Sequence, residues 1–218
     1  MDSDFWSDAW QTGRIGFHSD AVHPALQTHL GALVSGPDAC VLVPLCGKSR
    51  DLRWLSSQGH EVVGVEWVEQ ALRELFEQGE ERPERHRVGP FEAWKEPGLC
   101  VLQGDMFSLK GDHLSRPPTA VWDRACLVAV APQRRRELVD VVRRVLAPGG
   151  RILLNVFDYD QGEMNGPPFA VPEAEVRQLF AGCTLTLLEC RDGHSIFDSN
   201  PDRNLSRFDI FTWLIELP

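Results

Sequence analysis

The turn Pro44–Ser49 is the first place in this sequence where residue types and spacing suit a chemical role. It follows an apolar run, contains Gly47, and leads through a helix-like stretch to a second apolar run that ends in one carboxylate, Glu66. Nucleotide-binding half-sheets have this order. A glycine in the turn lets the backbone approach the ligand, and an acidic residue about twenty positions later accepts hydrogen bonds from ribose hydroxyls. The order predicts a site for an adenosine-containing ligand.

The glycine content of this turn narrows the choice of ligand. Dinucleotide-binding folds carry Gly-x-Gly-x-x-Gly, whose backbone amides cradle a pyrophosphate, and this turn has one glycine. The sequence Gly47-Lys48-Ser49 matches the end of a Walker A loop, but Leu42 stands where that loop needs its first glycine. We therefore expect a cofactor with adenosine and no phosphate, and S-adenosylmethionine is one.

The sequence pattern around these residues predicts alternating strands and helices. Such alternation predicts an α/β, Rossmann-like fold, with a mostly parallel sheet and helices on both faces. Apolar runs predict a seven-stranded sheet, with strands at Cys40–Leu45, Glu61–Glu66, Leu99–Gln103, Ala120–Ala125, Arg151–Asp158, Thr184–Arg191 and Arg207–Leu217. Helical periods predict the main helices, at 21–34, Ser49–Gln58, Val68–Gln78 and Gln133–Leu146. The last two strands have no helix between them, which predicts an antiparallel edge.

Two charged stretches are expected to lie outside the regular core. Residues 79–98 carry three prolines and many charges, so we predict an irregular segment there, with Phe91 and Trp94 packed on the body of the domain. The basic run Arg134–Arg136 opens a predicted helix, and we interpret it as a solvated face.

The composition limits the classes of partner. A chain of 218 residues is long enough for one α/β domain, and a net charge of -10 argues against nucleic acid, because duplex binding needs clustered Lys and Arg. The N-terminus has no apolar stretch of a signal peptide, and no apolar run approaches the ~20 residues of a membrane span. Six cysteines without a Cys-x-x-Cys pair indicate reduced thiols rather than zinc ligands. We expect a cytoplasmic protein without metal or membrane partner, and no interface signal argues for more than a monomer.

Several short segments, spread over most of the chain, carry a family resemblance. They are Trp6 with Trp10, Gly16–His18, Pro44–Lys48, Gly59–Glu66, Val121–Arg124, Pro148–Gly150 and Gly166–Phe169. In this order they resemble the thiopurine S-methyltransferases. The Pro-Leu-Cys-Gly-Lys turn together with Trp-Asp-Arg is the most specific part, whereas Pro-Gly-Gly before a strand occurs in many class I methyltransferases. The polar loop 192–204 is the least similar to the family.

The resemblance implies a class I methyltransferase fold and a set of cofactor contacts. Trp6 and Trp10 would belong to an N-terminal lid, residues 1–20, that covers S-adenosylmethionine. The backbone of Leu45 would meet the methionine part of the cofactor, and Glu66 would bind the ribose hydroxyls. The whole chain, residues 1–218, would then form one methyltransferase domain.

The resemblance also implies contacts to the adenine and to the methyl acceptor. Asp105 and Met106 would flank the adenine, although many relatives have no aspartate at the position of Asp105. Arg124 would lie near both the cofactor and the acceptor, and Phe17 would line the acceptor pocket. The acceptor would be a small aromatic or heterocyclic thiol.

Each of these residues also has a structural interpretation. Glu66 could cap the helix that follows it, and Arg124 could pair with Asp123 or with Asp105. Trp6 and Trp10, four residues apart, could be core aromatics, which is the usual role of a stripe at helical spacing. The histidines near the N-terminus are interpreted as structural or solvated residues.

The chemistry of methyl transfer assigns a role to Arg124. The reaction is an in-line displacement with a good leaving group, so the protein mainly aligns the reactants and excludes water. A heterocyclic thiol is partly ionised near neutral pH, so a general base is not obligatory, and a fixed cation at Arg124 would stabilise the thiolate. Two alternatives stay open: methylation of small inorganic nucleophiles (selenium or tellurium species, halide or thiocyanate), and non-catalytic binding of S-adenosylmethionine.

Overall fold

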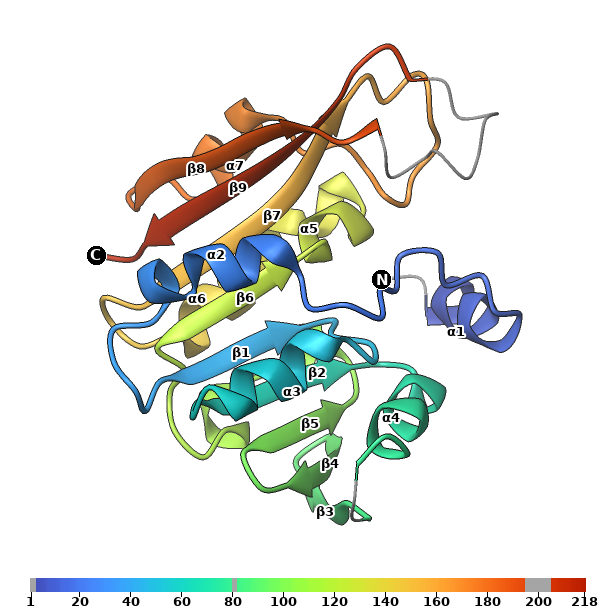
Figure 1. Ribbon diagram of the computed structural model, residues 1–218, viewed down its shortest axis with the longest axis vertical. Helices are drawn as coiled ribbons and strands as arrows, with labels where there is room; N and C mark the ends of the chain where they lie inside the picture. The colour runs from blue at the N-terminus through green and yellow to red at the C-terminus, as the bar shows by residue number, and fades with distance from the viewer. Residues whose placement is uncertain (1–2, 80–81, 195–204) are drawn as a thin grey trace.

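A twisted sheet runs through the part of the chain that this computed structural model describes, residues 3–79, 82–194 and 205–218 (Figure 1). It has nine strands in the order β3-β4-β5-β2-β1-β6-β7-β9-β8. The strands are β1 Cys40–Pro44, β2 Glu61–Glu66, β3 Glu84–Val88, β4 Phe91–Glu96, β5 Leu99–Gln103, β6 Ala120–Arg124, β7 Arg151–Tyr159, β8 Thr184–Asp192 and β9 Phe208–Glu216.

The central strands are parallel, as the alternation of strands and helices predicts. The parallel ladder runs through β5, β2, β1, β6 and β7. The last two strands, β8 and β9, pair antiparallel with each other, and β9 pairs antiparallel with β7. The parallel strands are buried on both faces, which explains why they read as nearly continuous apolar runs in the sequence.

The sheet has two strands more than the seven predicted. The segment 79–98, which we expected to be irregular, contains the hairpin β3–β4, and β4 pairs antiparallel with β5. Its prolines flank the strands instead of interrupting them, since Pro83 precedes β3, Pro90 lies in the turn, and Pro97 follows β4. Phe91 and Trp94 are buried as predicted. The edge strand β3 is charged and exposed, which hides its strand character and protects the edge from pairing.

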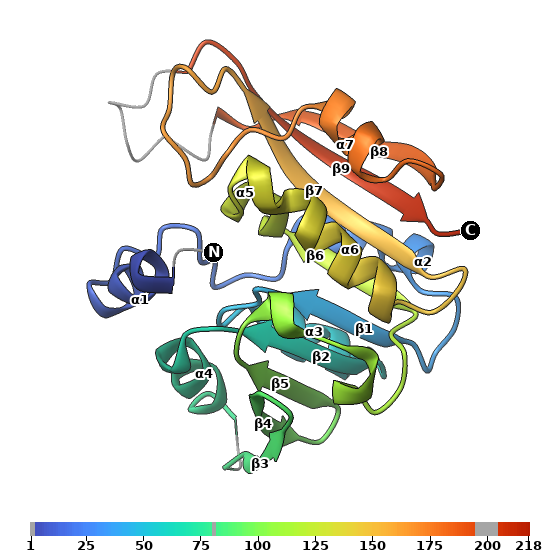
Figure 2. The same cartoon turned by 180° about the vertical axis from the view of Figure 1, so that it is seen from behind.

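Helices cover both faces of the sheet (Figures 1 and 2). Apolar side chains of α2, α3 and α4 pack into one core cluster, and those of α5, α6 and α7 into a second. The helices are α1 Ser3–Gln11, α2 Pro24–Leu33, α3 Arg50–Ser57, α4 Glu69–Phe76, α5 Cys126–Ala129, α6 Arg135–Val145 and α7 Glu173–Leu179, and the short 3-10 helices are η1 Met106–Ser108, η2 Gly111–His113 and η3 Pro132–Arg134.

The basic run at the start of α6 is not a solvated face throughout. The side chain of Arg135 is completely buried. Its guanidinium donates to the carbonyl oxygens of Leu127, Val130 and Ala170 and forms an ion pair of 2.6 Å with Glu175. Nε and Nη1 thus have acceptors, whereas Nη2 has no hydrogen-bond partner among the described residues. The ion pair and these acceptors offset the cost of burying the charge. Arg135 therefore ties α6 to α5 and to the segment before α7.

A membrane-spanning helix and a metal site would each require particular features among the described residues. No helix among them has the length and apolar character needed to cross a membrane. Over the same residues, no group of three or more His, Cys, Asp or Glu side chains is arranged to hold a metal ion.

Candidate active site

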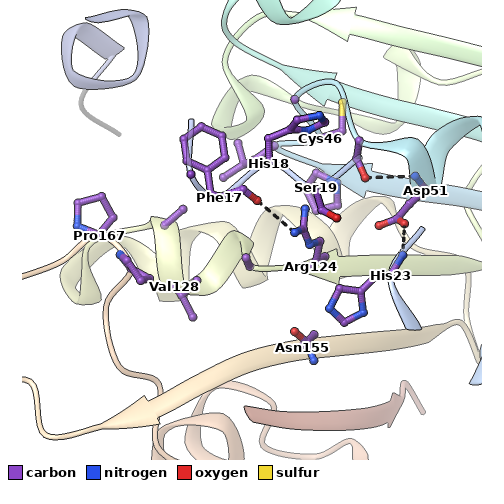
Figure 3. Close-up of a pocket in the computed structure, with 18 of the residues that line it drawn as sticks. Phe17, His18, Ser19, His23, Cys46, Asp51, Arg124, Val128, Asn155 and Pro167 are labelled. Atoms are coloured by element: carbon purple, nitrogen blue, oxygen red, sulfur yellow. Dashed lines mark hydrogen bonds between the residues drawn. The ribbon is translucent and has the colours of Figure 1, made fainter. Parts of the chain in front are cut away.

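A cavity of ≈ 570 Å³ opens at the carboxyl ends of β1, β2, β6 and β7 (Figure 3). Its size is typical of sites for small molecules, and open α/β sheets bind ligands at this edge. The residues predicted from the sequence that line it are Trp6, Trp10, Phe17, Leu45, Glu66 and Arg124. Segments far apart in the chain therefore meet at one site.

The turn after β1 brings its backbone against the end of β2. Leu45 has a φ of 47° and Gly47 a φ of 53°, so two residues of the turn adopt the left-handed conformation. Leu45 does this with a side chain, and such strained residues cluster at functional sites. Gly64 in β2 makes room for the turn, because a Cβ there would lie 2.7 Å from the Sγ of Cys46.

The carboxylate of Glu66 is buried at the end of β2. One oxygen, Oε2, accepts a hydrogen bond of 2.8 Å from the backbone N–H of Gly47, and the other accepts one of 2.7 Å from the N–H of Val68, at the start of α4. Burial raises the pKa of Glu66, and these backbone hydrogen bonds oppose that shift. Glu66 thus holds the backbone at the start of α4 and also lines the cavity. Its contact with the ribose of a cofactor stays a prediction.

The N-terminal aromatics form one cluster at the cavity. The rings of Trp6 and Trp10 lie 5.4 Å and 6.0 Å from the ring of Phe17, both edge-on. Trp10 is buried, and the amino group of Lys48 lies 5.7 Å from its ring centre. Phe17 keeps 43% of its surface exposed. The first helix therefore rests on the turn after β1, while Phe17 offers an open aromatic face.

Arg124 ends β6 and points toward the N-terminal segment (Figure 3). Its guanidinium donates to the backbone carbonyl of Phe17, 3.1 Å away. Among the residues that the structure describes, no carboxylate lies within ion-pair distance of Arg124. The two predicted structural partners are engaged elsewhere: Asp123 accepts from the N–H of Cys126, and Asp105 accepts from the N–H of Phe107. The cation is thus available to the cavity.

Asp105 and Met106 do not line the cavity. Asp105 starts the short helix η1, and the side chain of Met106 is completely buried in the core. They follow a residue that lies beside the site in space, since the N–H of Gly104 donates to the carbonyl of Glu66 over 2.9 Å. Their contact with an adenine stays a prediction.

Several polar residues of the cavity wall were not predicted from the sequence. His23, which we interpreted as structural or solvated, lines it from the start of α2, and Asn155 lines it from β7. Asp51 is buried beside them and accepts hydrogen bonds of 2.8 Å from the backbone N–H of His23 and from Nε1 of Trp122. The sequence contains one signal for Asn155, a single amide inside an apolar strand. Such a residue is a candidate for the site, because a buried polar group needs a hydrogen-bond partner.

Comparisons with known proteins agree with this geometry. The sequence model of the family described as Thiopurine S-methyltransferase (TPMT) matches residues 1–213. The chain is 44% identical to a thiopurine S-methyltransferase of Pseudomonas aeruginosa over 84% of this chain and 83% of that protein. It is 38% identical to one of Photobacterium profundum over 100% of both chains.

A solved structure supports the same fold. The 1,6-didemethyltoxoflavin-N1-methyltransferase of Burkholderia thailandensis, crystallised with S-adenosylhomocysteine, superimposes with a TM-score of 0.66 at 19% identity, over 99% of this chain and 87% of that chain. The class I methyltransferase fold predicted from the sequence is thereby confirmed, with nine strands instead of seven. Family model, relatives and fold agree, and the chain belongs to the thiopurine S-methyltransferase family.

Proposed function

We propose that this protein transfers the methyl group of S-adenosylmethionine to the sulfur of small aromatic or heterocyclic thiols. One observation carries the proposal. The guanidinium of Arg124 has no carboxylate partner among the described residues and lies 3.1 Å from the backbone carbonyl of Phe17, whose ring is partly exposed, in the cavity that Glu66 also lines. A flat acceptor and a negative sulfur suit such a pair of side chains.

The residues at the carboxyl end of β2 fit the cofactor. Each oxygen of Glu66 is held by one backbone N–H and keeps a lone pair for a ribose hydroxyl. The strained backbone at Leu45 presents peptide groups to the cavity, where the methionine part of the cofactor would lie. When bound, S-adenosylmethionine supplies the methyl group and a neutral thioether as leaving group.

Arg124 would act on the acceptor sulfur. A guanidinium stays charged and directs several N–H groups from one plane, so it can hold the carbonyl of Phe17 and a thiolate together. Fixing that cation before the reaction lowers the cost of placing a negative sulfur in a cavity with little water. The thiol proton leaves to solvent or buffer, because a heterocyclic thiol is partly ionised near neutral pH.

The first twenty residues would serve as a lid. Trp6 and Trp10 line the cavity together with Phe17, and Trp10 rests on the turn that follows β1. A lid of this kind excludes water and holds the acceptor against the cofactor. In this proposal residues 1–218 work as one methyltransferase domain, a cytoplasmic monomer whose partner is a small thiol.

The two other activities left open by the sequence are less well supported. Inorganic nucleophiles need no aromatic wall, whereas Phe17 presents one. A non-catalytic binder needs no cation aimed at the acceptor side, whereas Arg124 provides one. Membership of the family also favours a thiol sulfur as the acceptor.

A single assay separates these activities. Purified protein is incubated with methyl-labelled S-adenosylmethionine and, in parallel, with purine-6-thiol, benzenethiol, selenite, tellurite, iodide or thiocyanate. We expect label in the thiol products. Label in the inorganic products alone would favour the first alternative. Tight binding of S-adenosylhomocysteine without any label transfer would favour the second.

A further inference from the structure

A row of polar residues crosses four neighbouring strands behind the acceptor side of the cavity. Arg124 on β6 lies opposite Asn155 on β7, Asn155 lies opposite Thr212 on β9, and Thr212 lies opposite Glu189 on β8. Residues opposite each other on neighbouring strands point to the same face of a sheet. Asn155 and Thr212 are buried, so each polar atom of these two side chains requires a partner.

The hydrogen bonds along this row fix the orientation of the amide of Asn155. The hydroxyl of Thr212 donates to the carboxylate of Glu189 at 3.5 Å. It has one hydrogen, so toward Asn155 it acts as an acceptor, and Nδ2 of Asn155 donates to it at 3.0 Å. The amide oxygen must then lie on the opposite side, where Figure 3 shows it directed toward Arg124 and the cavity. No hydrogen-bond donor to this oxygen occurs among the described residues.

His23 offers the complementary group from the start of α2. Its Nδ1 accepts a hydrogen bond of 3.3 Å from the N–H of Ala25, which caps the helix. Burial and the positive charge of Arg124 lower the pKa of His23 to about 4, so the ring is neutral at pH 7. A neutral imidazole that accepts at Nδ1 carries its hydrogen on Nε2. The backbone is held by Asp51 and the ring packs against Trp122, 5.3 Å between centres.

We propose that His23 and Asn155 form a donor–acceptor pair that recognises the nitrogen edge of a heteroaromatic methyl acceptor. Nε2–H of His23 would donate to a bare ring nitrogen, and the amide oxygen of Asn155 would accept from a ring N–H. The inference rests on the proposed function, because it concerns the acceptor of that reaction. It selects acceptors that keep one N–H and one bare nitrogen after the thiol has lost its proton, as purine-6-thiol does.

The test compares two acceptors of similar shape on the same protein. Purine-6-thiol has the nitrogen edge, and naphthalene-1-thiol has two fused rings without nitrogen. The variant His23→Asn removes the Nε2 donor but keeps a side-chain oxygen that can cap α2. The variant Asn155→Leu removes the amide oxygen and keeps the number and branching of the side-chain heavy atoms. The matched control is His86→Asn, since His86 is exposed on β3, away from the cavity.

For purine-6-thiol, each cavity variant should lower kcat/KM about tenfold, the size of one buried hydrogen bond. For naphthalene-1-thiol, kcat/KM should change less than about twofold, and His86→Asn should change neither value. Because both acceptors are measured on one preparation, a smaller folded fraction cannot alter their ratio. Equal losses for the two acceptors, or no loss for purine-6-thiol, would overturn the inference.

A binding measurement separates this inference from the proposed reaction. Calorimetry with S-adenosylhomocysteine present should show that purine-6-thiol binds the wild type about tenfold more tightly than either cavity variant. If no thiol were methylated but this ranking held, the proposed function would fail and the recognition by His23 and Asn155 would stand. If the wild type and both variants bound purine-6-thiol equally, or not at all, the recognition itself would be wrong.

Discussion

Glu66 and Gly47, nineteen positions apart in the chain, are joined by a hydrogen bond of 2.8 Å from the backbone N–H of Gly47 to the carboxylate. The same carboxylate holds the N–H of Val68. One buried side chain therefore fixes both the turn after β1 and the start of α4, the two segments that border the side of the cavity that we propose for the cofactor.

Replacement of Glu66 by alanine should weaken cofactor binding. We expect a loss of about 1.5–3 kcal/mol for S-adenosylmethionine and S-adenosylhomocysteine, because hydrogen bonds to a charged group contribute that much. Isothermal calorimetry measures the loss, and NAD serves as the ligand that should not bind. Unchanged affinity in a folded Glu66→Ala protein would remove Glu66 from the cofactor site.

Arg124→Lys should lower the rate of methyl transfer more than it lowers cofactor affinity. Lysine keeps the charge but loses the planar set of donors that reaches both the carbonyl of Phe17 and the acceptor. We expect about a tenfold loss of kcat, and about a hundredfold loss for Arg124→Gln, in the range found when a preorganised donor is removed. The loss should grow with the pKa of the acceptor thiol. An Arg124 with a purely structural role would lower the melting temperature and leave kcat of the folded fraction normal.

Deletion of residues 1–18 should leave the α/β body folded and greatly reduce methyl transfer. Every strand of the described sheet lies beyond this segment, whereas Trp6, Trp10 and Phe17 lie within it. Far-UV circular dichroism checks the fold, and labelled methyl transfer checks the activity. In the full chain, tryptophan fluorescence and protection from proteases at this segment should change when S-adenosylhomocysteine is added. Full activity of the truncated protein would contradict a lid.

The buried carboxyl of Asp123 should make stability depend on pH. Burial raises the pKa of Asp123 from 3.8 to about 6, so between these pH values the folded state binds a proton that the unfolded state has released. Its contribution to the free energy of unfolding therefore falls as pH rises through this window. The two pKa values correspond to at most about 3 kcal/mol.

The variant Asp123→Asn isolates this contribution. An amide oxygen can still accept from the N–H of Cys126, and the amide does not titrate. Urea unfolding at several pH values should show the variant gaining stability relative to the wild type between pH 4 and pH 7, by up to about 3 kcal/mol. His23, whose pKa is lowered to about 4, makes stability rise with pH in both proteins. Subtracting the free energy of unfolding of the wild type from that of the variant removes this contribution. A constant difference across this range would show that Asp123 does not titrate there.

The parallel half of the fold could be predicted because its signals are local. Strands buried on both faces, such as β1 and β2, give continuous apolar runs, and the helices between them end at Gly or Pro. The hairpin β3–β4 gives no such signal, because β3 is a charged edge strand with only one neighbour. Its existence depends on pairing with β5, which periodicity within the segment cannot reveal.

The residues of the site also fall into those that local sequence signals identify and those that depend on distant segments. Glu66 and Gly47 stand at positions that a strand–turn–strand order identifies, and Arg124 stands at the end of a strand. The burial of Arg135 depends on three carbonyls from two other segments. A basic run in the sequence therefore predicts an exposed face instead. The role of Asn155 depends on strands that arrive about sixty residues later in the chain, since its register partner Thr212 lies on β9.

The two sides of the cavity come from different strands. The side assigned to the cofactor comes from β1 and β2, whereas His23 and Asn155 come from α2 and β7. Substitutions at His23 and Asn155 should therefore alter which compounds are accepted without touching the strands to which we assign the methyl donor. Among relatives, acceptor range should diverge through changes at few positions while dependence on the donor stays constant. The same separation makes His23 and Asn155 the natural positions for a library that redirects this protein to new thiols.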